Sequence, residues 1–461
     1  MNIICRALTL FQILWAKEYE FTTEDMSKTH LYMTDPEITS LSDNIKECTK
    51  LKYLGINLTK ITSLPLSIGE LENLESLTLS NNYYLELLPE ELFNCSKLER
   101  LNLHSNKLTS LPDNIRQLKY LEELNLDLNK LQSLPAGLCE CSKLKKLCAS
   151  INELTSLPDE LGKLEMLEVL KLEKNKLKEL PASIGNLKKM VTLNLRKNDL
   201  DSLPEEICEN LTFLDLSENQ FRQFPAAIGK CLQLKELKLS NNKLEKLDAN
   251  IGNLIKLTSL RLEKNQFKQF PIEITELRNL NYLYLNENHL TDITAEMGKL
   301  EKLTTLSLAD NKFEQFPNGL TKLRHLTSLD ISHNQLKVLP AEIGDFKSLK
   351  AFFLDFNELE ILPDELGKLQ NLSSLYLGNN NIKSLPESMG KLKVLRILSL
   401  KNNKLNYLPH EMKDLPRIFS LNLQNNEILD AGIEEETLGK KELKEIFKSR
   451  VHFQNHLINL F

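Results

Sequence analysis

The amino-acid sequence predicts an α/β repeat solenoid, in which short parallel strands alternate with short helical or extended segments. Two observations support this prediction. One motif recurs about every 23 residues along most of the 461-residue chain. Within each copy, leucines alternate with polar residues over a few positions, as expected for a short strand with one buried face. A core built by repetition of one aliphatic residue therefore replaces the separate globular domains that this length would otherwise predict.

The motif is clearest where residues 326–348 are followed by residues 349–371, which share the template LxxLxLxxNxLxxLPxxIGxLxx. A further copy has Thr59 in the Asn slot, and a degenerate copy over residues 30–41 has Pro36 there. We predict an array of about 18 units over residues 28–429, between an N-terminal extension or cap (1–27) and a C-terminal cap (430–461). The Asn slot is filled by Asn82, Asn106, Asn129, Asn152, Asn175, Asn198, Asn219, Asn242, Asn265, Asn288, Asn311, Asn334, Asn357, Asn380, Asn403 and Asn426.

Each part of the template has a physical role. The LxL step is a short strand, the LxxLP step closes a tight stretch in which proline fixes φ, and IGxLxx returns the chain along the far side. One turn alone has no second layer against which to bury its leucines, so stability comes from stacking on neighbours. Backbone groups at the corners need hydrogen-bond partners, and an asparagine amide offers both donors and an acceptor. We therefore predict that the repeated asparagines are structural.

This template resembles the leucine-rich repeat family. The 23-residue LPxxIGxL version is similar to the group that includes the Ras-suppressor and Scribble-type intracellular scaffolds, the plant Ras-group-related proteins and bacterial leucine-rich repeat proteins. The resemblance implies a horseshoe with a parallel β-sheet on its concave face and short helical or extended segments on its convex face. By analogy with the Ras-linked scaffolds, it implies a small GTPase or a phosphatase as the partner.

The repeat departs from its template at several points. The unit that contains Cys208 is two residues short, which predicts a local change of curvature. Ser42, Asp248 and Thr294 stand in the place of the proline, which we interpret as tolerated drift in surface turns.

The two ends allow more than one interpretation. An apolar run over residues 7–16 fits an export signal poorly, and the alternatives are a cap helix or a translation start at Met26. The last residues predict an amphipathic helix that serves as a lid or as a docking helix for a partner. The apolar side chains that define the two helices are Ile4, Leu8, Phe11 and Trp15 at one end and Leu438, Leu443, Ile446 and Phe447 at the other.

Composition narrows the classes of partner and compartment. The net charge of −6 is small for this length, so nucleic acid and anionic lipid are not expected partners. The apolar run at the N-terminus is too short to span a bilayer.

Four of the eight cysteines, Cys48, Cys95, Cys141 and Cys231, occupy a buried leucine slot, where a thiol acts as a small hydrophobic group. These features favour a reducing compartment and a cytoplasmic location.

The sequence contains no motif for nucleotide, metal or cofactor binding and no clustered histidines, so we expect neither enzymatic activity nor a cofactor. A cryptic hydrolase or ligase is the alternative, for which Cys148 is the one cysteine expected to be exposed on the concave face.

Two groups of side chains on the expected concave face are candidate partner-binding surfaces. Exposed aromatic residues next to charges resemble a binding hot spot, although such rings also pack laterally on neighbouring strands. Mixed charges in the middle of the array form either a second surface or an ordinary solvated face. The aromatic and acidic group comprises Tyr282, Tyr284, Asp310, Asp330, Phe353, Asp355, Phe356 and Tyr376, and the basic group comprises Lys171, Arg196, Lys238 and Arg261.

The function predicted from these patterns is a non-catalytic scaffold that binds a protein partner on its concave face, in a signalling role. The alternative is a secreted bacterial leucine-rich repeat protein that engages host molecules, which requires the first 16 residues to act as an export signal.

Overall fold

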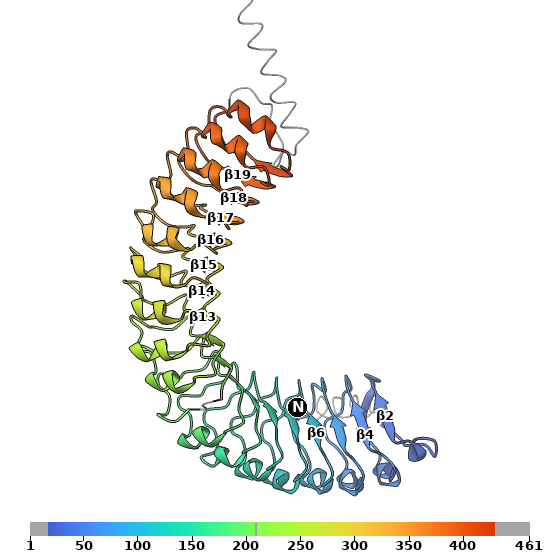
Figure 1. Ribbon diagram of the computed structural model, residues 1–461. Coiled ribbons are helices and arrows are strands. Elements are labelled where there is room, and N and C mark those ends of the chain that lie inside the picture. The colour runs from blue at the N-terminus through green and yellow to red at the C-terminus, as the bar shows by residue number, and fades with distance from the viewer. Residues whose placement is uncertain (1–16, 208–209, 429–461) are drawn as a thin grey trace, which may run out of the picture. The chain divides into compact units, whose positions relative to one another are not determined.

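A computed structural model describes residues 17–207 and 210–428 of the chain (Figure 1). Its described residues fall into two compact units: unit 1 lies within Met1–Phe221 and Pro225–Leu234, and unit 2 lies within Arg222–Phe224 and Lys235–Phe461. In each unit the chain forms stacked coils, with strands along one side and short 3₁₀ helices along the other (Figure 1). The repeat solenoid predicted from the sequence is therefore confirmed, and the convex segments are 3₁₀ helices.

Most strands of unit 1 follow one another at close to one-repeat spacing and are only three residues long, whereas Lys17–Tyr19 and Ile38–Leu41 pair in a separate two-stranded sheet. The strands are β1 (Lys17–Tyr19), β2 (His30–Met33), β3 (Ile38–Leu41), β4 (Tyr53–Ile56), β5 (Ser76–Thr78), β6 (Arg100–Asn102), β7 (Glu123–Asn125), β8 (Lys146–Cys148), β9 (Val169–Lys171), β10 (Thr192–Asn194) and β11 (Phe213–Asp215). The 3₁₀ helices are η1 (Asp25–Ser27), η2 (Asp43–Glu47), η3 (Leu66–Glu70), η4 (Glu90–Asn94), η5 (Asp113–Gln117), η6 (Ala136–Glu140), η7 (Leu161–Lys163), η8 (Ala182–Asn186) and η9 (Ala226–Lys230).

Unit 2 repeats the same coil with fewer irregularities. Its strands are β12 (Glu236–Lys238), β13 (Ser259–Arg261), β14 (Tyr282–Tyr284), β15 (Thr305–Ser307), β16 (Ser328–Asp330), β17 (Ala351–Phe353), β18 (Ser374–Tyr376), β19 (Ile397–Ser399) and β20 (Ser420–Asn422). Its 3₁₀ helices are η10 (Ala249–Asn253), η11 (Ile272–Glu276), η12 (Ala295–Lys299), η13 (Asn318–Lys322), η14 (Ala341–Asp345), η15 (Asp364–Lys368), η16 (Glu387–Lys391) and η17 (His410–Asp414).

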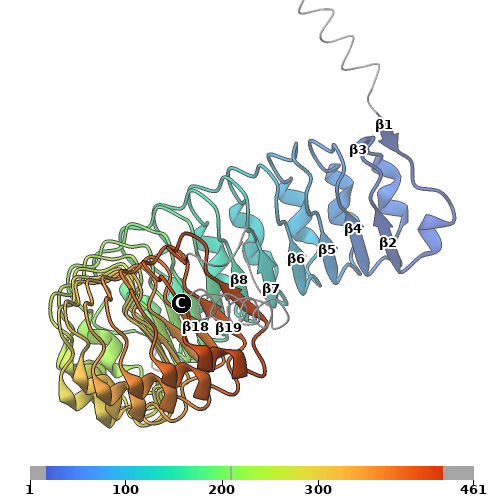
Figure 2. The same cartoon turned by 90° about the horizontal axis from the view of Figure 1, so that it is seen from above.

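The strands of the long sheet in each unit pair in parallel and in register, whereas the pairing of β1 with β3 contains a register shift between Lys17 and Glu18. Equivalent residues of successive coils lie side by side, as Asp330 does with Phe353 and Phe353 with Tyr376. In the three-residue strands from β5 to β20 the middle residue is buried, whereas the first and third are mostly half-buried or exposed. Figure 2 shows β4 to β8 following one another in this way. Register therefore converts the sequence period into continuous rows of side chains on the strand face.

The repeated asparagines join successive coils, and Asn175 is representative. Its Nδ2 donates to the carbonyl of Ala149 in the preceding coil at 2.9 Å and to that of Leu172 in its own coil at 3.0 Å. Its Oδ1 accepts from the backbone N–H of Leu154 at 3.0 Å. The amide therefore satisfies backbone groups that the core would otherwise leave unpaired, which confirms the structural role predicted for these residues.

The residue directly before each asparagine slot has an unusual backbone conformation. Among the described residues, seventeen non-glycine residues have φ between 51° and 60°, in the left-handed region. The N–H of one of them, Phe356, donates to the carbonyl of Gly378 in the next coil at 2.9 Å. Hydrogen bonds of this kind oppose the strain of the left-handed conformation. They also place the side chains of these residues in a further row at the ends of the strands.

Two of the departures from the template have a structural explanation. Where Ser42 and Asp248 replace proline, their side chains accept hydrogen bonds from the backbone N–H groups of Asn44 and Asn250 and cap η2 and η10. Our interpretation of these substitutions as drift was therefore incomplete, because each replaces a residue that fixes φ with one that caps the helix. Cys208, near which we predicted a change of curvature, lies outside the described residues, as do the apolar run 7–16 and the C-terminal segment 430–461.

The core between strands and helices is aliphatic, with aromatic residues in some leucine slots. Phe316, Phe346 and Phe352 contact one another edge to face in unit 2, with ring centroids 6.3 to 6.5 Å apart. The four cysteines assigned to leucine slots are fully buried, as predicted.

Candidate protein-binding surface

The strand face presents the predicted binding residues in rows. Lys171 and Arg196 belong to unit 1, and the other ten belong to unit 2. The basic group predicted from the sequence is thus divided between the two units. The aromatic and acidic group lies wholly within unit 2 but separates into three smaller arrangements.

The first arrangement, here called the ring–carboxylate cluster, comprises Asp330, Phe353, Asp355 and Tyr376. Phe353 and Tyr376 occupy the third positions of β17 and β18, and their rings stack with centroids 4.8 Å apart and planes 7° apart. Both rings remain half-buried rather than buried. The lateral packing considered as an alternative is therefore present, and it leaves ring surface accessible to a partner.

The two carboxylates of this cluster are held by backbone and hydroxyl groups. Oδ1 of Asp330 accepts from the N–H of Ser332 at 3.1 Å and from its hydroxyl at 2.7 Å. Oδ1 of Asp355 accepts from the N–H of Gly378 at 2.9 Å. Partial burial raises the pKa of Asp355 above its ordinary value, against the opposing effect of the Gly378 hydrogen bond. Both carboxylates are thus fixed in position beside the rings.

The second arrangement joins one residue of the basic group to one of the aromatic group. The guanidinium carbon of Arg261 on β13 lies 4.5 Å from the ring centroid of Tyr284 on β14. Arg261 Nη1 also lies 3.3 Å from Oε1 of Glu263. Tyr282, which lies on β14 with Tyr284, is 46% exposed. The three strand steps between Tyr284 and Phe353 correspond to about 14 Å, so the tyrosines of β14 do not join the ring–carboxylate cluster.

The third arrangement lies in the row of left-handed residues. Phe356 stacks on His333, with ring centroids 4.1 Å apart, and His333 Nδ1 lies 3.8 Å from Oδ1 of Asp310. Sequence reasoning missed His333. The signal that could have found it is its spacing of 23 residues from both Asp310 and Phe356.

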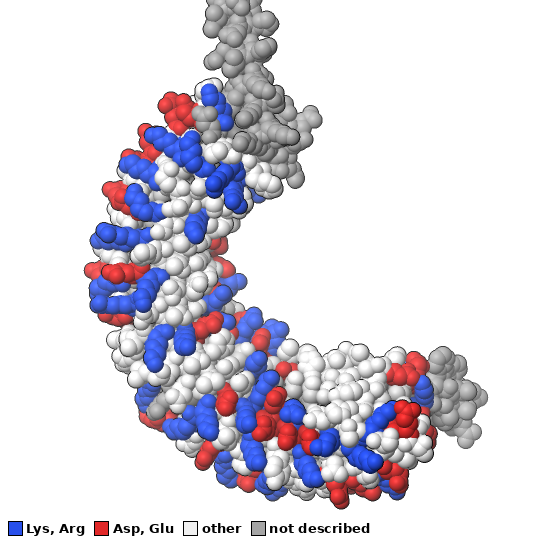
Figure 3. All heavy atoms as spheres, turned by 45° about the vertical axis from the view of Figure 1, so that its right-hand side comes forward, with Lys and Arg blue, Asp and Glu red and all other residues white. Residues whose placement is uncertain are grey.

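The basic residues mostly form ion pairs with acidic residues. Arg196 Nη2 lies 2.5 Å from Oε1 of Glu218, and its Nη1 lies 3.4 Å from Oε1 of Glu173. Lys238 Nζ lies 3.1 Å from Oε1 of Glu236. On the surface seen in Figure 3, positive and negative side chains are interspersed rather than separated into regions of one sign. Exposed pairs of this kind contribute little to stability and create no strong field. The basic group is therefore the weaker of the two candidates.

The strand face of unit 1 carries a further aromatic group that sequence reasoning did not single out. His30 and Tyr53 stack with ring centroids 4.3 Å apart, and Tyr32 between them in sequence is largely exposed. Gly55 lies beneath the Tyr32 ring, where an added Cβ would come within 2.5 Å of it. The signal was hidden because these residues belong to the degenerate first copies of the repeat.

The expectation that Cys148 is an exposed thiol was wrong. Cys148 is only 4% exposed, because its short side chain lies in register between the longer side chains of Asn125 and Lys171. Burial raises the pKa of the thiol above its ordinary value. Cys148 is thus neither accessible nor readily ionised, and it does not support a nucleophilic role.

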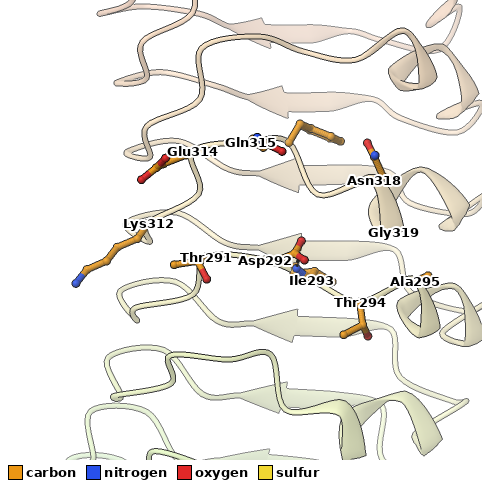
Figure 4. A pocket seen from close by; sticks show the side chains of 11 residues that line it. Thr291, Asp292, Ile293, Thr294, Ala295, Lys312, Glu314, Gln315, Asn318 and Gly319 are labelled. Carbon is orange, nitrogen blue, oxygen red and sulfur yellow. Dashed lines mark hydrogen bonds between the residues drawn. The ribbon is translucent and has the colours of Figure 1, made fainter.

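A hollow of about 650 Å³ lies beside the strands of unit 2 rather than on them (Figure 4). Its lining residues lie within 291–295 and 312–319 of two successive coils, and they include the first residues of η12 and η13. None of the predicted binding residues lines it.

Within residues 17–207 and 210–428, no group of histidine, cysteine or acidic side chains is arranged to hold a metal ion. In the same ranges, no helix is both long and apolar enough to span a membrane.

The chain matches two family models over most of its length. The model described as "Leucine-rich repeat region" matches residues 37–154 and 214–316. The model described as "Leucine rich repeat" matches residues 301–359, 324–382 and 370–428. No curated protein sequence matches the chain significantly.

Several solved structures are similar to the chain. A leucine-rich repeat protein of Leptospira interrogans shares 32% sequence identity with a TM-score of 0.71, over 94% of this chain and 98% of that one. The plant peptide hormone receptor RGFR1 in complex with RGF2 shares 27% identity with a TM-score of 0.60, over 89% and 77% of the two chains. The internalin InlF from Listeria monocytogenes shares 25% identity with a TM-score of 0.54, over 77% and 88%.

Proposed function

The chain belongs to the leucine-rich repeat family, whose members are in general non-catalytic scaffolds for protein–protein interaction, and from this premise we propose that it binds a protein partner through the strand face of unit 2. The observation that carries the proposal is the ring–carboxylate cluster. Accessible aromatic rings beside fixed charges are typical of the residues that dominate binding energy at protein interfaces. Because the strands already hold these side chains in place, little conformational entropy is lost when a partner binds.

The similarity to RGFR1 supports a polypeptide ligand, because that receptor was solved in complex with the peptide hormone RGF2. A small GTPase or a phosphatase remains a proposal that rests on resemblance to the Ras-linked scaffolds alone. The burial of all six described cysteines without disulfides supports a reducing compartment and a cytoplasmic location.

The proposal is tested by a triple substitution, Tyr284→Ala, Phe353→Ala and Tyr376→Ala, in the full chain. Proteins cross-linked to the wild-type protein in native lysate are identified by mass spectrometry and compared with those from the variant. A matched control replaces Tyr83, Tyr84 and Tyr120, three exposed tyrosines of unit 1, by alanine. We expect the control to retain the wild-type partner and the triple variant to lose it without a loss of folded structure. Equal recovery by all three proteins would contradict the proposal.

The second candidate function, a secreted bacterial protein that engages host molecules, is favoured by the similarity to the Leptospira interrogans protein over nearly the full length of both chains. Mass spectrometry of the mature amino terminus tests it. A chain that begins at Lys17 supports export, and one that begins at Met1 or Met26 contradicts it.

A further inference from the structure

We propose that the ring–carboxylate cluster binds the guanidinium group of an arginine side chain on the partner. This inference rests on the proposed function and specifies the chemistry that the strand face of unit 2 recognises. The partner is then recognised by a segment that carries an accessible arginine.

The chain itself contains a guanidinium bound in this manner. Arg261 places its guanidinium over the Tyr284 ring at 4.5 Å while Glu263, two residues further on, lies 3.3 Å from Nη1. One aromatic ring on the strand face and one carboxylate at the end of a strand are therefore enough to fix a guanidinium here. The attraction of a cation to a ring face adds to that of the ion pair.

The ring–carboxylate cluster has the same two kinds of group, an aromatic ring and a carboxylate, but no basic residue adjoins Phe353 in its row. In the third-position row, Phe353 has Tyr376 on one side and Asp330 on the other, where Tyr284 has Arg261. Because Tyr376 stacks on one face of Phe353, the opposite face is directed toward the Asp330 side. Asp330 thus stands beside Phe353 where the second arrangement has Arg261 beside Tyr284, and it leaves the ring face of Phe353 to a group from outside.

Both carboxylates retain an oxygen for such a group. Oδ1 of Asp330 and Oδ1 of Asp355 carry the hydrogen bonds described above, and among the described residues no hydrogen bond reaches Oδ2 of either. Neither carboxylate forms an ion pair within the described part of the chain, although the charge of Lys401 acts on Asp355 from a greater distance. The two aspartates also repel each other, since the charge of Asp330 contributes to the raised pKa of Asp355. A cation between them would relieve this repulsion.

Arginine fits this arrangement better than lysine does. A guanidinium is planar, stacks on aromatic faces and has five N–H donors, so it can cover Phe353 and donate to both carboxylates at once. An ammonium group is a compact, strongly hydrated charge that gains less from the flat ring. The site should therefore discriminate by shape as well as by charge.

The test uses saturation-transfer difference NMR on the full chain with three small probes of similar size that carry different side-chain head groups. The probes are the N-acetyl methylamides of arginine, lysine and citrulline, the last being a neutral analogue of arginine. We expect arginine to bind roughly five-fold more tightly than the other two. The variants Phe353→Ala and Asp330→Asn/Asp355→Asn should lose most of the arginine signal, and asparagine retains an oxygen that can accept the internal hydrogen bonds.

A gain-of-binding variant provides an independent arm. Arg261→Ala vacates the ring face of Tyr284 beside Glu263, so this variant should bind a second arginine probe with no change at the ring–carboxylate cluster. Equal binding of the three probes, an arginine signal unchanged in the Phe353 and aspartate variants, or no gain in Arg261→Ala would each overturn the assignment. Because no partner is needed, failure here leaves the cross-linking test of the proposed function unaffected.

Discussion

Oδ1 of Asn175 accepts a hydrogen bond from the backbone N–H of Leu154, 21 residues earlier in the chain, at 3.0 Å. The same amide donates to the carbonyls of Ala149 and Leu172. One side chain thus provides partners for three backbone groups in two coils. It does so in the interior, where water does not reach those groups.

Asn175→Ala should destabilise the protein by about 3 kcal/mol, because buried backbone groups lose their partners. Urea denaturation followed by circular dichroism measures the change. Asn186→Ala is the control, because Asn186 is exposed at the end of η8 and its loss should have little effect. Equal stability of the two variants would show that the ladder of asparagines is dispensable.

Ile151→Asn should stabilise the protein by about 1 kcal/mol. Ile151 has φ 56° and is partly exposed, and a β-branched residue is strained in the left-handed region, where asparagine is tolerated. The reverse change, Asn241→Ile, at φ 53° in the equivalent position of another coil, should destabilise by a similar amount. Thermal unfolding of both variants checks the prediction, and a shift of the same sign in both would contradict it.

Asp355→Asn should make the protein more stable near neutral pH and should weaken the pH dependence of its stability. Burial raises the pKa of Asp355, so the folded state binds the proton more tightly than the unfolded chain does. The resulting stabilisation is present below the ordinary pKa of an aspartate and is lost as pH rises through the raised value. The melting temperature of the variant should therefore exceed that of the wild type increasingly between about pH 4 and pH 7.

Asp345→Asn serves as the control for this pH series, because Asp345 is exposed on η14. Its melting curve should follow the wild type across the range. A difference between wild type and Asp355→Asn that stays constant with pH would show that the carboxylate does not titrate differently on folding.

The six described cysteines should resist iodoacetamide at pH 8 in the folded protein. Burial raises the pKa of Cys95 and Cys141 to about 12 and that of Cys139 to about 11, so thiolate is scarce as well as inaccessible. Peptide mass spectrometry with and without urea gives the modified fraction at each position. Rapid labelling of Cys148 in the folded protein would contradict the burial of this thiol.

The fold was largely predictable from the sequence because one period determines strand spacing, core and hydrogen bonding together. The role of Asn175, for example, follows from its polarity and its invariant place among leucines. Capping by Ser42 and Asp248 was not predicted, because the repeat template has proline at this position, and proline has no side chain that can cap a helix. The rows of the strand face were also predictable, since register follows from the period.

The contacts within those rows were not predictable. Arg261 lies over Tyr284, and the rings of Phe353 and Tyr376 stack, because of the side-chain rotamers that these residues adopt. Rotamers cannot be derived from the order of residues in a repeat. Burial of Cys148 likewise depends on the length of its neighbours rather than on its own place in the strand.

The ladder of asparagines has a consequence for how such a chain can change over time. Each amide contacts only its own coil and the one before it, so removing or duplicating one whole period inside a unit rejoins equivalent partners across the new junction. An insertion or deletion of another length must be absorbed within its own coil. The scaffold can therefore lengthen or shorten in whole steps, and each step adds or removes one line of contacts without altering the rest.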